Sequence, residues 1–243
     1  EARCSAVRRQ NEERRRAEEE RRSNPVIDRA IAMMSFVRIP AGTFWMGSGP
    51  SDPTSFSNDH PLHEVTLTQS FDLQATPVTQ FVWAAIMGSP LPDDQKADLP
   101  AEGITWDDAH RFISRLNWLL SLECYRLPTE AEWEFACRAG SRNLQYGELK
   151  RIAWCVESGA NRVRPVGKKQ PNAWALYDML GNVWEWCQGS LDGTGHFNVF
   201  RGGAWNLNKP DSLRIANRAG DAADTRSSFV GFRVVLNAPP PAP

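Results

Sequence analysis

The pattern of apolar and polar positions separates a charged N-terminal segment from the rest of the chain. Residues 7–22 contain almost no apolar side chains, and opposite charges lie four positions apart, as in Glu12 with Arg16 and Glu18 with Arg22. This spacing is typical of a solvated helix. Without an apolar stripe, such a helix is not expected to belong to a core.

A short second helix is predicted directly after this segment. Asn24 followed by Pro25 is a typical helix start, so a helix from residue 25 to about residue 34 is predicted. It is expected to dock on the domain through Ile27, Ile31 and Met34. Residues 1–35 are therefore predicted to be a helical connector to an upstream domain of the same chain, and a frayed end is an equally good interpretation.

From Phe36 the pattern becomes that of strands. Residues 36–47 predict a hairpin that turns at Ala41–Gly42, and the alternation over residues 63–73 predicts one strand. Thr76 and Pro77 then predict the start of a helix that ends at Gly88.

Two further helices are predicted by their caps. Thr105 precedes Asp108 by three residues and Thr129 precedes Glu132 by three, which is the spacing of a capping box. The predicted helices cover about residues 106–120 and 130–138. After Gly140 the helical pattern ends, and short strands, glycine turns and tryptophans follow. We therefore predict an α+β domain without the regular alternation of a doubly wound sheet.

Composition narrows the classes of partner. The 28 basic and 29 acidic residues give a net charge of −1, so neither nucleic acid nor a membrane is expected as a partner. No apolar run reaches the length of a membrane span, and because the first residue is Glu1 we expect the chain to be part of a longer protein. The cysteines are odd in number and widely spaced, at Cys4, Cys124, Cys137, Cys155 and Cys187. Reduced thiols and a cytoplasmic location are the expectation.

Four motifs occur in an order and spacing that resemble those of the formylglycine-generating enzyme domain. They are YRLPTEAEWEFACRAG at 125–140, ALYDMLGNVWEWC at 175–187, RGGAWN at 201–206 and VGFRVV at 230–235. The resemblance implies a C-type-lectin-like fold with little regular secondary structure over residues 36–238. Residues 239–243 would then be a proline-rich tail.

The same resemblance predicts that the chain is not an oxidase. Oxidase members of this family bind copper through two cysteines beyond the RGG motif, and the matching positions here hold Leu207 and Ser212. Neither side chain is a thiolate ligand for copper. A divergent oxidase of the formylglycine or iron-dependent sulfoxide-synthase type, with Cys187 or histidines as replacement ligands, and an accessory subunit of an enzyme complex remain as alternatives.

A structural calcium ion is the cofactor that the resemblance implies, with no copper or iron. The matching groups are the side chains of Asp178 and Glu185 and the carbonyls of Gly181 and Val183. Two carboxylates with main-chain carbonyls suit a hard cation. The alternative is that Asp178 caps a turn and Glu185 pairs with an arginine.

Residues 205–230 resemble the variable region of bacterial proteins that are diversified by retroelements. Small polar residues surround the aromatic Trp205 and Phe229, as an adaptable binding surface requires. The predicted ligand-binding residues are Trp205, Asn206, Leu207, Asn208, Lys209, Asp211, Ser212, Asn217, Asp221, Asp224, Ser227, Ser228 and Phe229. An ordinary irregular loop region is the alternative.

Four arginines close to this region are interpreted as scaffold rather than as ligand contacts. They are Arg201, Arg214, Arg218 and Arg233, with glutamates of the 130–138 helix as plausible partners. The sequence thus predicts a non-enzymatic recognition protein that binds a protein or another macromolecule through residues 205–230.

Overall fold

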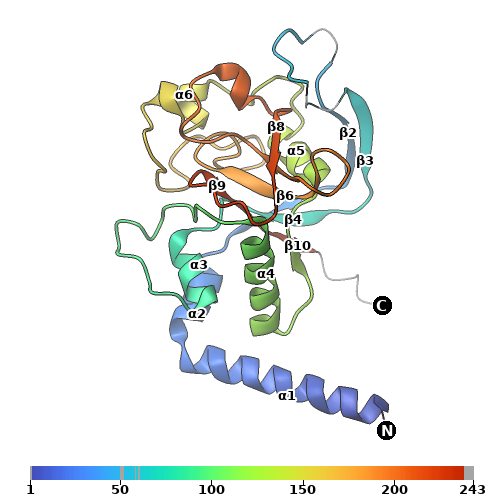
Figure 1. Ribbon diagram of the computed structural model, residues 1–243, viewed down its shortest axis with the longest axis vertical. Helices are drawn as coiled ribbons and strands as arrows, with labels where there is room; N and C mark the ends of the chain where they lie inside the picture. The colour runs from blue at the N-terminus through green and yellow to red at the C-terminus, as the bar shows by residue number, and fades with distance from the viewer. Residues whose placement is uncertain (1, 50–51, 58, 60, 238–243) are drawn as a thin grey trace.

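The N-terminal helix is longer and better attached than the sequence indicates. The computed structural model describes residues 2–49, 52–57, 59 and 61–237, so the predicted tail at 239–243 lies outside the described residues. Helix α1 (Ala2–Ser23) runs along one end of the molecule in Figure 1. Ala17 is fully buried, and Glu20 forms an ion pair with Arg115 of helix α4 (Trp106–Leu120). The predicted full solvation is therefore wrong at these positions, because one side of the helix contacts α4.

Helix α2 (Pro25–Ala32) docks on the domain as predicted. The Asn24 side chain accepts a hydrogen bond from the Val26 amide at 3.2 Å, and Pro25 occupies the first turn. Ile27 is 1% exposed and belongs to the main apolar cluster. The short helix is thus fixed by its cap at one end and by apolar burial along one side.

The first strands do not form the predicted hairpin. Strand β1 (Phe36–Ile39) pairs with β4 (Phe71–Gln74), whereas β2 (Gly42–Met46) pairs with β3 (His63–Leu67). Pro40 has no N–H to donate to a ladder, and the chain changes sheets at this point instead of reversing. The single strand predicted over 63–73 is correspondingly two strands in two sheets.

The predicted helices after residue 76 are largely confirmed. Helix α3 (Gln80–Met87) ends at Gly88, whose φ is 68°, but it begins after the N-cap Thr79 rather than at Pro77. Helices α4 and α5 (Glu130–Arg138) have the predicted bounds and both reciprocal capping boxes. Contrary to the sequence pattern, a short helix α6 (Leu149–Ile152) and a 3-10 turn η1 (Val156–Ser158) follow Gly140.

The strands of the C-terminal half complete one four-stranded sheet and form a second one. Strand β10 (Val235–Asn237) joins β4 to β5 (Tyr125–Arg126) and completes the sheet β1-β4-β10-β5. The other sheet has the order β8-β7-β6-β9, from β6 (Trp184–Ser190), β7 (Asn198–Arg201), β8 (Arg218–Asp221) and β9 (Val230–Gly231). A 3-10 turn η2 (Pro210–Leu213) lies between β7 and β8. The domain is α+β, as the sequence predicts.

Helices and sheets enclose a core rich in aromatic side chains. Trp133 and Trp186 are almost fully buried, and Trp186 packs edge-on against Phe200 with ring centroids 5.0 Å apart. Over the described ranges, no helix is both long enough and apolar enough to cross a membrane. The sheet β8-β7-β6-β9 carries the candidate site, because residues 205–230 begin after β7 and reach β9.

Candidate ligand-recognition surface

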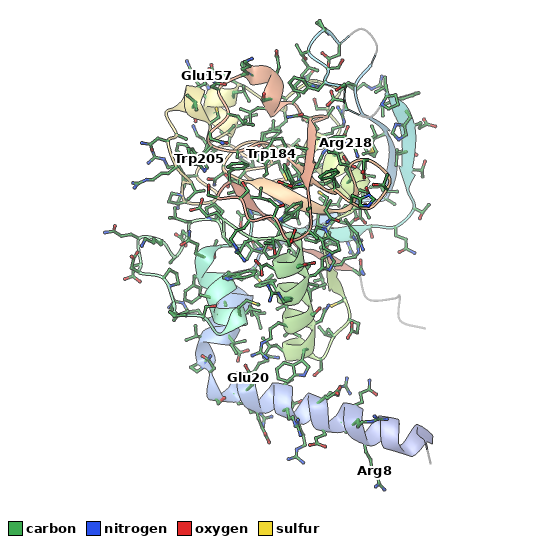
Figure 2. The ribbon with its side chains drawn as sticks, in the orientation of Figure 1. Arg8, Glu20, Glu157, Trp184, Trp205 and Arg218 are labelled. Atoms are coloured by element: carbon green, nitrogen blue, oxygen red, sulfur yellow. The ribbon has the colours of Figure 1, made fainter. Side chains whose placement is uncertain are left out.

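Residues 205–230 form two loops on either side of β8: a first loop of residues 205–217 and a second loop of residues 222–229. The far ends of the two loops meet at one short segment of the scaffold. The Trp205 amide donates to the Asn182 carbonyl at 3.0 Å, and the Trp184 amide donates to the Phe229 carbonyl at 2.9 Å. The aromatic residues at the two ends of the region are thus attached within two positions of each other. Figure 2 shows Trp205 and Trp184 near each other on the same side of the domain.

The structure divides the predicted site residues by exposure. Six of them are exposed, namely Asn206, Asn208, Lys209, Asp211, Asp224 and Ser228. Six are half-buried, namely Trp205, Leu207, Ser212, Asp221, Ser227 and Phe229. Asn217 is only 6% exposed, and its amide donates to the Ser212 carbonyl at 2.7 Å. The structure therefore places Asn217 in the scaffold, because residues 213–218 are all buried.

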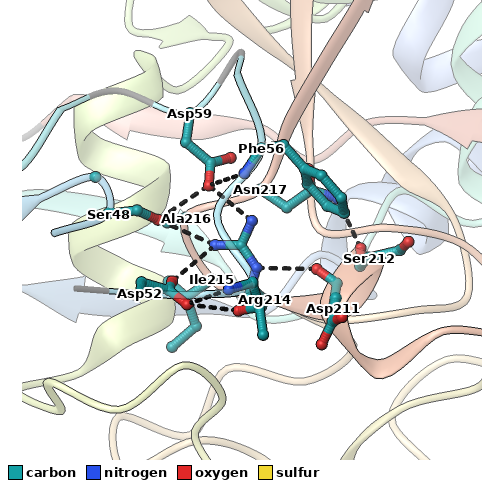
Figure 3. A network of polar contacts seen from close by, with 12 residues as sticks. Ser48, Asp52, Phe56, Asp59, Asp211, Ser212, Arg214, Ile215, Ala216 and Asn217 are labelled. Carbon is teal, nitrogen blue, oxygen red and sulfur yellow. Dashed lines mark hydrogen bonds and ion pairs between the residues drawn. The ribbon is translucent and has the colours of Figure 1, made fainter. Parts of the chain in front are cut away.

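The base of the first loop is held by a buried arginine. Arg214 is 1% exposed and donates to Asp59 at 2.7 Å, to Ser48 at 3.0 Å and to Asp52 at 3.3 Å. Its guanidinium carbon also lies 5.0 Å from the centre of the Phe56 ring. Figure 3 shows how these groups surround the guanidinium, so that the loop before β3 is attached to the segment after η2.

The second loop is attached to the start of α4. The Asp107 amide donates to the Ala223 carbonyl at 3.3 Å, and Arg226 pairs with Asp108 at 2.7 Å. Burial alone would raise the pKa of Asp108, but hydrogen bonds from Thr105 and the charge of Arg226 hold this pKa below its usual value. The Asp108 carboxylate therefore both caps α4 and fixes the second loop.

Sequence reasoning missed Asn182, which organises the surroundings of the first loop. It is fully buried with φ at 62°, and its amide donates to the Trp154 carbonyl at 2.8 Å. Its side chain exchanges two hydrogen bonds of 3.0 Å with the backbone of Arg164. Asparagine after glycine in GNVWEW is a signal for this geometry, because asparagine tolerates the left-handed region.

The predicted scaffold arginines are confirmed in that role. Arg201 is fully buried, pairs with Glu130 at 2.9 Å and with Glu134, and donates to the carbonyls of residues 215 and 216. Arg218 pairs with the same Glu130 at 2.5 Å. Glu132, in contrast, pairs with Arg126 at 2.6 Å. The arginines thus join β7 and β8 to helix α5.

The groups predicted to bind calcium are partly committed to other partners. Both carboxylate oxygens of Glu185 accept hydrogen bonds of 2.7 Å from Arg233, and one also accepts from Trp133. Asp178 accepts from the Gly167 amide at 2.7 Å, and its Oδ1 is buried without a partner among the described residues. Glu185 does not fit a calcium ligand in this arrangement, because a guanidinium occupies its oxygens. A calcium site would rest on Asp178 and main-chain carbonyls, and it stays a prediction.

The structure places Leu207, one of the two positions that the resemblance matches to copper-binding cysteines, and Cys187. Leu207 packs partly buried against the core, and its carbonyl accepts from the Val156 amide at 3.1 Å. Cys187 is fully buried, and burial raises the pKa of its thiol well above the usual value. A buried neutral thiol is a poor nucleophile and a poor metal ligand. Over the described residues, no cluster of three or more histidine, cysteine or acidic side chains could hold a metal ion.

Comparison with known proteins agrees with this architecture. Inactive C-alpha-formylglycine-generating enzyme 2 of Mus musculus is 31% identical over 67% of this chain. The chain spans just over half of that relative, 57% of its length. The formylglycine-generating enzyme of Streptomyces coelicolor is 26% identical over 77% of this chain and 71% of the relative. Variable protein 1 of Treponema denticola superposes with a TM-score of 0.73 at 26% identity, over 84% of this chain and 95% of that structure.

A family model extends the resemblance to nearly the whole domain. The model of the sulfatase-modifying factor enzyme 1-like domain matches residues 23–238. It includes helix α2, both main sheets and both loops of the candidate surface. The chain therefore belongs to the sulfatase-modifying factor enzyme 1-like domain family and has its C-type-lectin-like fold.

Proposed function

We propose that this chain is a non-catalytic recognition protein that binds a protein or another macromolecule through the two loops of residues 205–230. The likeness to an inactive formylglycine-generating enzyme and to a variable protein supports a recognition role on this scaffold. In this proposal the loops are the diversified part of a retroelement target protein. The helices of residues 1–35 connect the surface to an upstream domain, and the protein acts in the cytoplasm.

One observation carries the proposal. Within a single stretch of chain, residues 213–218 are all buried, whereas residues 206, 208, 209 and 211 before them and 224 and 228 after them are exposed. The buried part contains Arg214 and Arg218, which are attached to the scaffold by ion pairs. The exposed part consists mainly of polar side chains, and it lies beside the half-buried rings of Trp205 and Phe229. The binding loops of antibodies likewise combine adaptable polar groups with rigid aromatic side chains.

A pair of displayed libraries tests the recognition role. In the first, Asn206, Asn208, Lys209, Asp211, Asp224 and Ser228 are randomised. In the control, six exposed positions elsewhere are randomised, namely Asp93, Asp94, Gln95, Lys96, Lys150 and Arg151. Both libraries are selected against lysozyme as the probe.

Only the first library is expected to yield folded binders with micromolar or better affinity. Equal yields from both libraries, or loss of folding throughout the first, would refute the proposal. Sequencing of the gene in related strains adds a genetic readout. Substitutions concentrated at the six exposed positions are expected under diversification, and an even spread along the gene contradicts it.

The absence of oxidase activity is tested separately. We expect the purified chain to show no oxygen consumption above the buffer rate when it is supplied with Cu(I) and a cysteine-containing peptide. The variant Leu207→Cys with Ser212→Cys is the matched control, and it is expected to gain Cu(I) binding because it restores two thiols at the positions of the family ligands. Turnover by the unmodified chain would revive the oxidase alternative.

A further inference from the structure

A groove beside the base of the first loop is lined by one edge of the small β2-β3 sheet and touches the candidate surface only at the buried Ala216. Its volume is about 940 Å³, and its walls come from consecutive residues of β2, from the loop after β2 and from residues 140–144 after α5. Three exposed apolar side chains line it, namely Trp45 at 45%, Leu62 at 44% and Leu144 at 43% exposed. Exposed apolar groups that gather around one hollow are typical of a binding site.

The backbone of β2 presents its unpaired edge to this groove. The Gly47 amide donates to Glu134 of α5 at 2.9 Å. In a trans peptide, the preceding C=O points the opposite way, so the Met46 carbonyl points toward β3. Backbone groups alternate in direction along a strand. The N–H and C=O groups of Phe44 therefore also point toward β3, and those of Thr43 and Trp45 point away from it.

The side chains of Thr43 and Thr66 agree with this orientation of the backbone groups. Thr43 lies opposite Thr66 on β3, and their hydroxyl oxygens are 2.8 Å apart. Such closeness is expected of a pair that does not exchange ladder hydrogen bonds, because its Cα atoms approach more closely. The free hydrogen-bonding groups of Thr43 and Trp45 therefore lie at the edge toward the groove, and those of Thr66 lie at the outer edge of β3.

The charges at the groove are largely neutralised by the protein itself, with two exceptions. Arg138 is paired with Glu134, and Asp52 is paired with Arg214. Glu64 on β3 and Arg142 after α5 are exposed and have no ion-pair partner among the described residues. The groove thus offers one acidic and one basic group beside apolar walls, and Phe44 and Phe135, with ring centroids 5.1 Å apart, form its inner wall.

From this geometry we propose that the groove binds an extended peptide of a partner protein as an added strand along Thr43 and Trp45. An unpaired strand edge is complementary to an extended backbone, and alternate peptide side chains then reach the two walls. The peptide has an apolar centre flanked by an acidic residue that faces Arg142 and a basic residue that faces Glu64. None of the six exposed loop positions lines the groove, so the site does not depend on the function proposed for the loops.

A displayed library of random dodecapeptides, selected on the full chain, identifies a probe peptide whose affinity is then measured by titration. Thr43→Pro removes one N–H from the groove edge, and it is expected to weaken binding about three- to tenfold. Thr66→Pro is the matched control, because it removes an N–H directly across the sheet on the outer edge. We expect this control to bind the peptide within about twofold of the unmodified chain.

Amide hydrogen exchange of the unmodified chain provides a readout that needs no variant. The peptide is expected to slow exchange at Thr43 and Trp45 and to leave Thr66 unchanged. The proposal is overturned if no peptide is enriched, if Thr43→Pro binds as well as Thr66→Pro, or if these two amides are not protected. A dimer of the chain that Thr43→Pro disrupts would assign the edge to a second copy instead. Randomising the six loop positions should leave the peptide affinity unchanged, which separates this site from the recognition loops.

Discussion

Two buried arginines attach the segment before the candidate surface and the first loop of that surface to the scaffold, and their partners lie in different kinds of structure. Arg201 lies in a strand and pairs with two glutamates of helix α5, so it joins two regular elements. Arg214 follows a 3-10 turn and pairs with two aspartates of the loop before β3. Neither arginine side chain has solvent-exposed surface. The partners of Arg201 lie in a regular helix, whereas the partners of Arg214 lie in a loop.

Because both guanidinium groups are buried, we expect burial of a charge not to determine its contribution to stability by itself. Glu130 and Glu134 are held in a regular helix with side chains that are 10% and 0% exposed, so we expect them to stay poorly hydrated if Arg201 is removed. Asp52 and Asp59 lie outside helices and strands, so we expect them to regain hydration more easily if Arg214 is removed. We therefore expect a global penalty in the first case and a mainly local one in the second.

The largest effect is expected for Arg201→Met. This change leaves buried carboxylates of Glu130 and Glu134 without one cation, so it should lower the free energy of unfolding by about 3–5 kcal/mol. Denaturant titration followed by tryptophan fluorescence measures the loss. Arg38→Met breaks the exposed pair with Asp72, which is 3.2 Å long, and serves as the control. A loss for Arg201→Met as small as that of the control would contradict the comparison.

A smaller global effect is expected for Arg214→Met. The free energy of unfolding should fall by about 1–2 kcal/mol, because the loop can rehydrate Asp52 and Asp59. Amide exchange at residues 52–57 and 212–217 should increase much more than exchange in α5. If amide exchange in α5 increases as much as exchange in these two segments, the two arginines act on the same cooperative unit, and the expected difference between a global and a local effect is contradicted.

A smaller effect again is expected at Asp108, because its partner Arg226 is largely exposed. Asp108→Asn should lower the free energy of unfolding by about 1 kcal/mol through loss of the charged cap of α4. The folded state lowers the pKa of Asp108, so the stabilisation is present above the ordinary pKa of an aspartate and is lost as the pH falls through the folded pKa. Stability curves from pH 5 to pH 2 should therefore be flatter in the variant. An unchanged slope would remove Asp108 from this role.

The smallest effect is expected from calcium removal. Because Arg233 already neutralises Glu185, a chelator should lower Tm by less than about 2 °C. Melting with added Ca²⁺ and with chelator measures the shift, and Asp178→Asn shows whether any shift depends on that carboxylate. A drop of 10 °C or more that Asp178→Asn abolishes would establish the calcium site and remove Arg233 as the main partner of this loop.

Local signals explain which parts of the fold could be predicted. The bounds of α4 and α5 follow from Thr105 and Thr129, because a capping box is a contact between residues three apart. The hairpin at 36–47 failed because the partner of β1 is β4, more than thirty residues away, and nothing local encodes that pairing.

The candidate surface shows the same limit. The position of residues 205–230 could be inferred from the flanking motifs, but the burial of Asn217 depends on its contact with Ser212 and on the packing around Arg214. Asn182 could not be found from local patterns, because its hydrogen bonds join it to Arg164, Trp154 and Trp205, all at least 18 residues away in the chain.

The attachment of the two recognition loops has a consequence for inheritance. At Trp205 and Phe229 the scaffold is bound through an amide and a carbonyl, which every amino acid except proline supplies at both sites. Replacing the exposed side chains between them, at residues 206, 208, 209, 211, 224 and 228, removes neither bond, whereas the buried Arg214 and Arg218 have to stay because they hold the scaffold. If these positions are diversified as proposed, new surfaces can arise by single substitutions that leave both attachments in place.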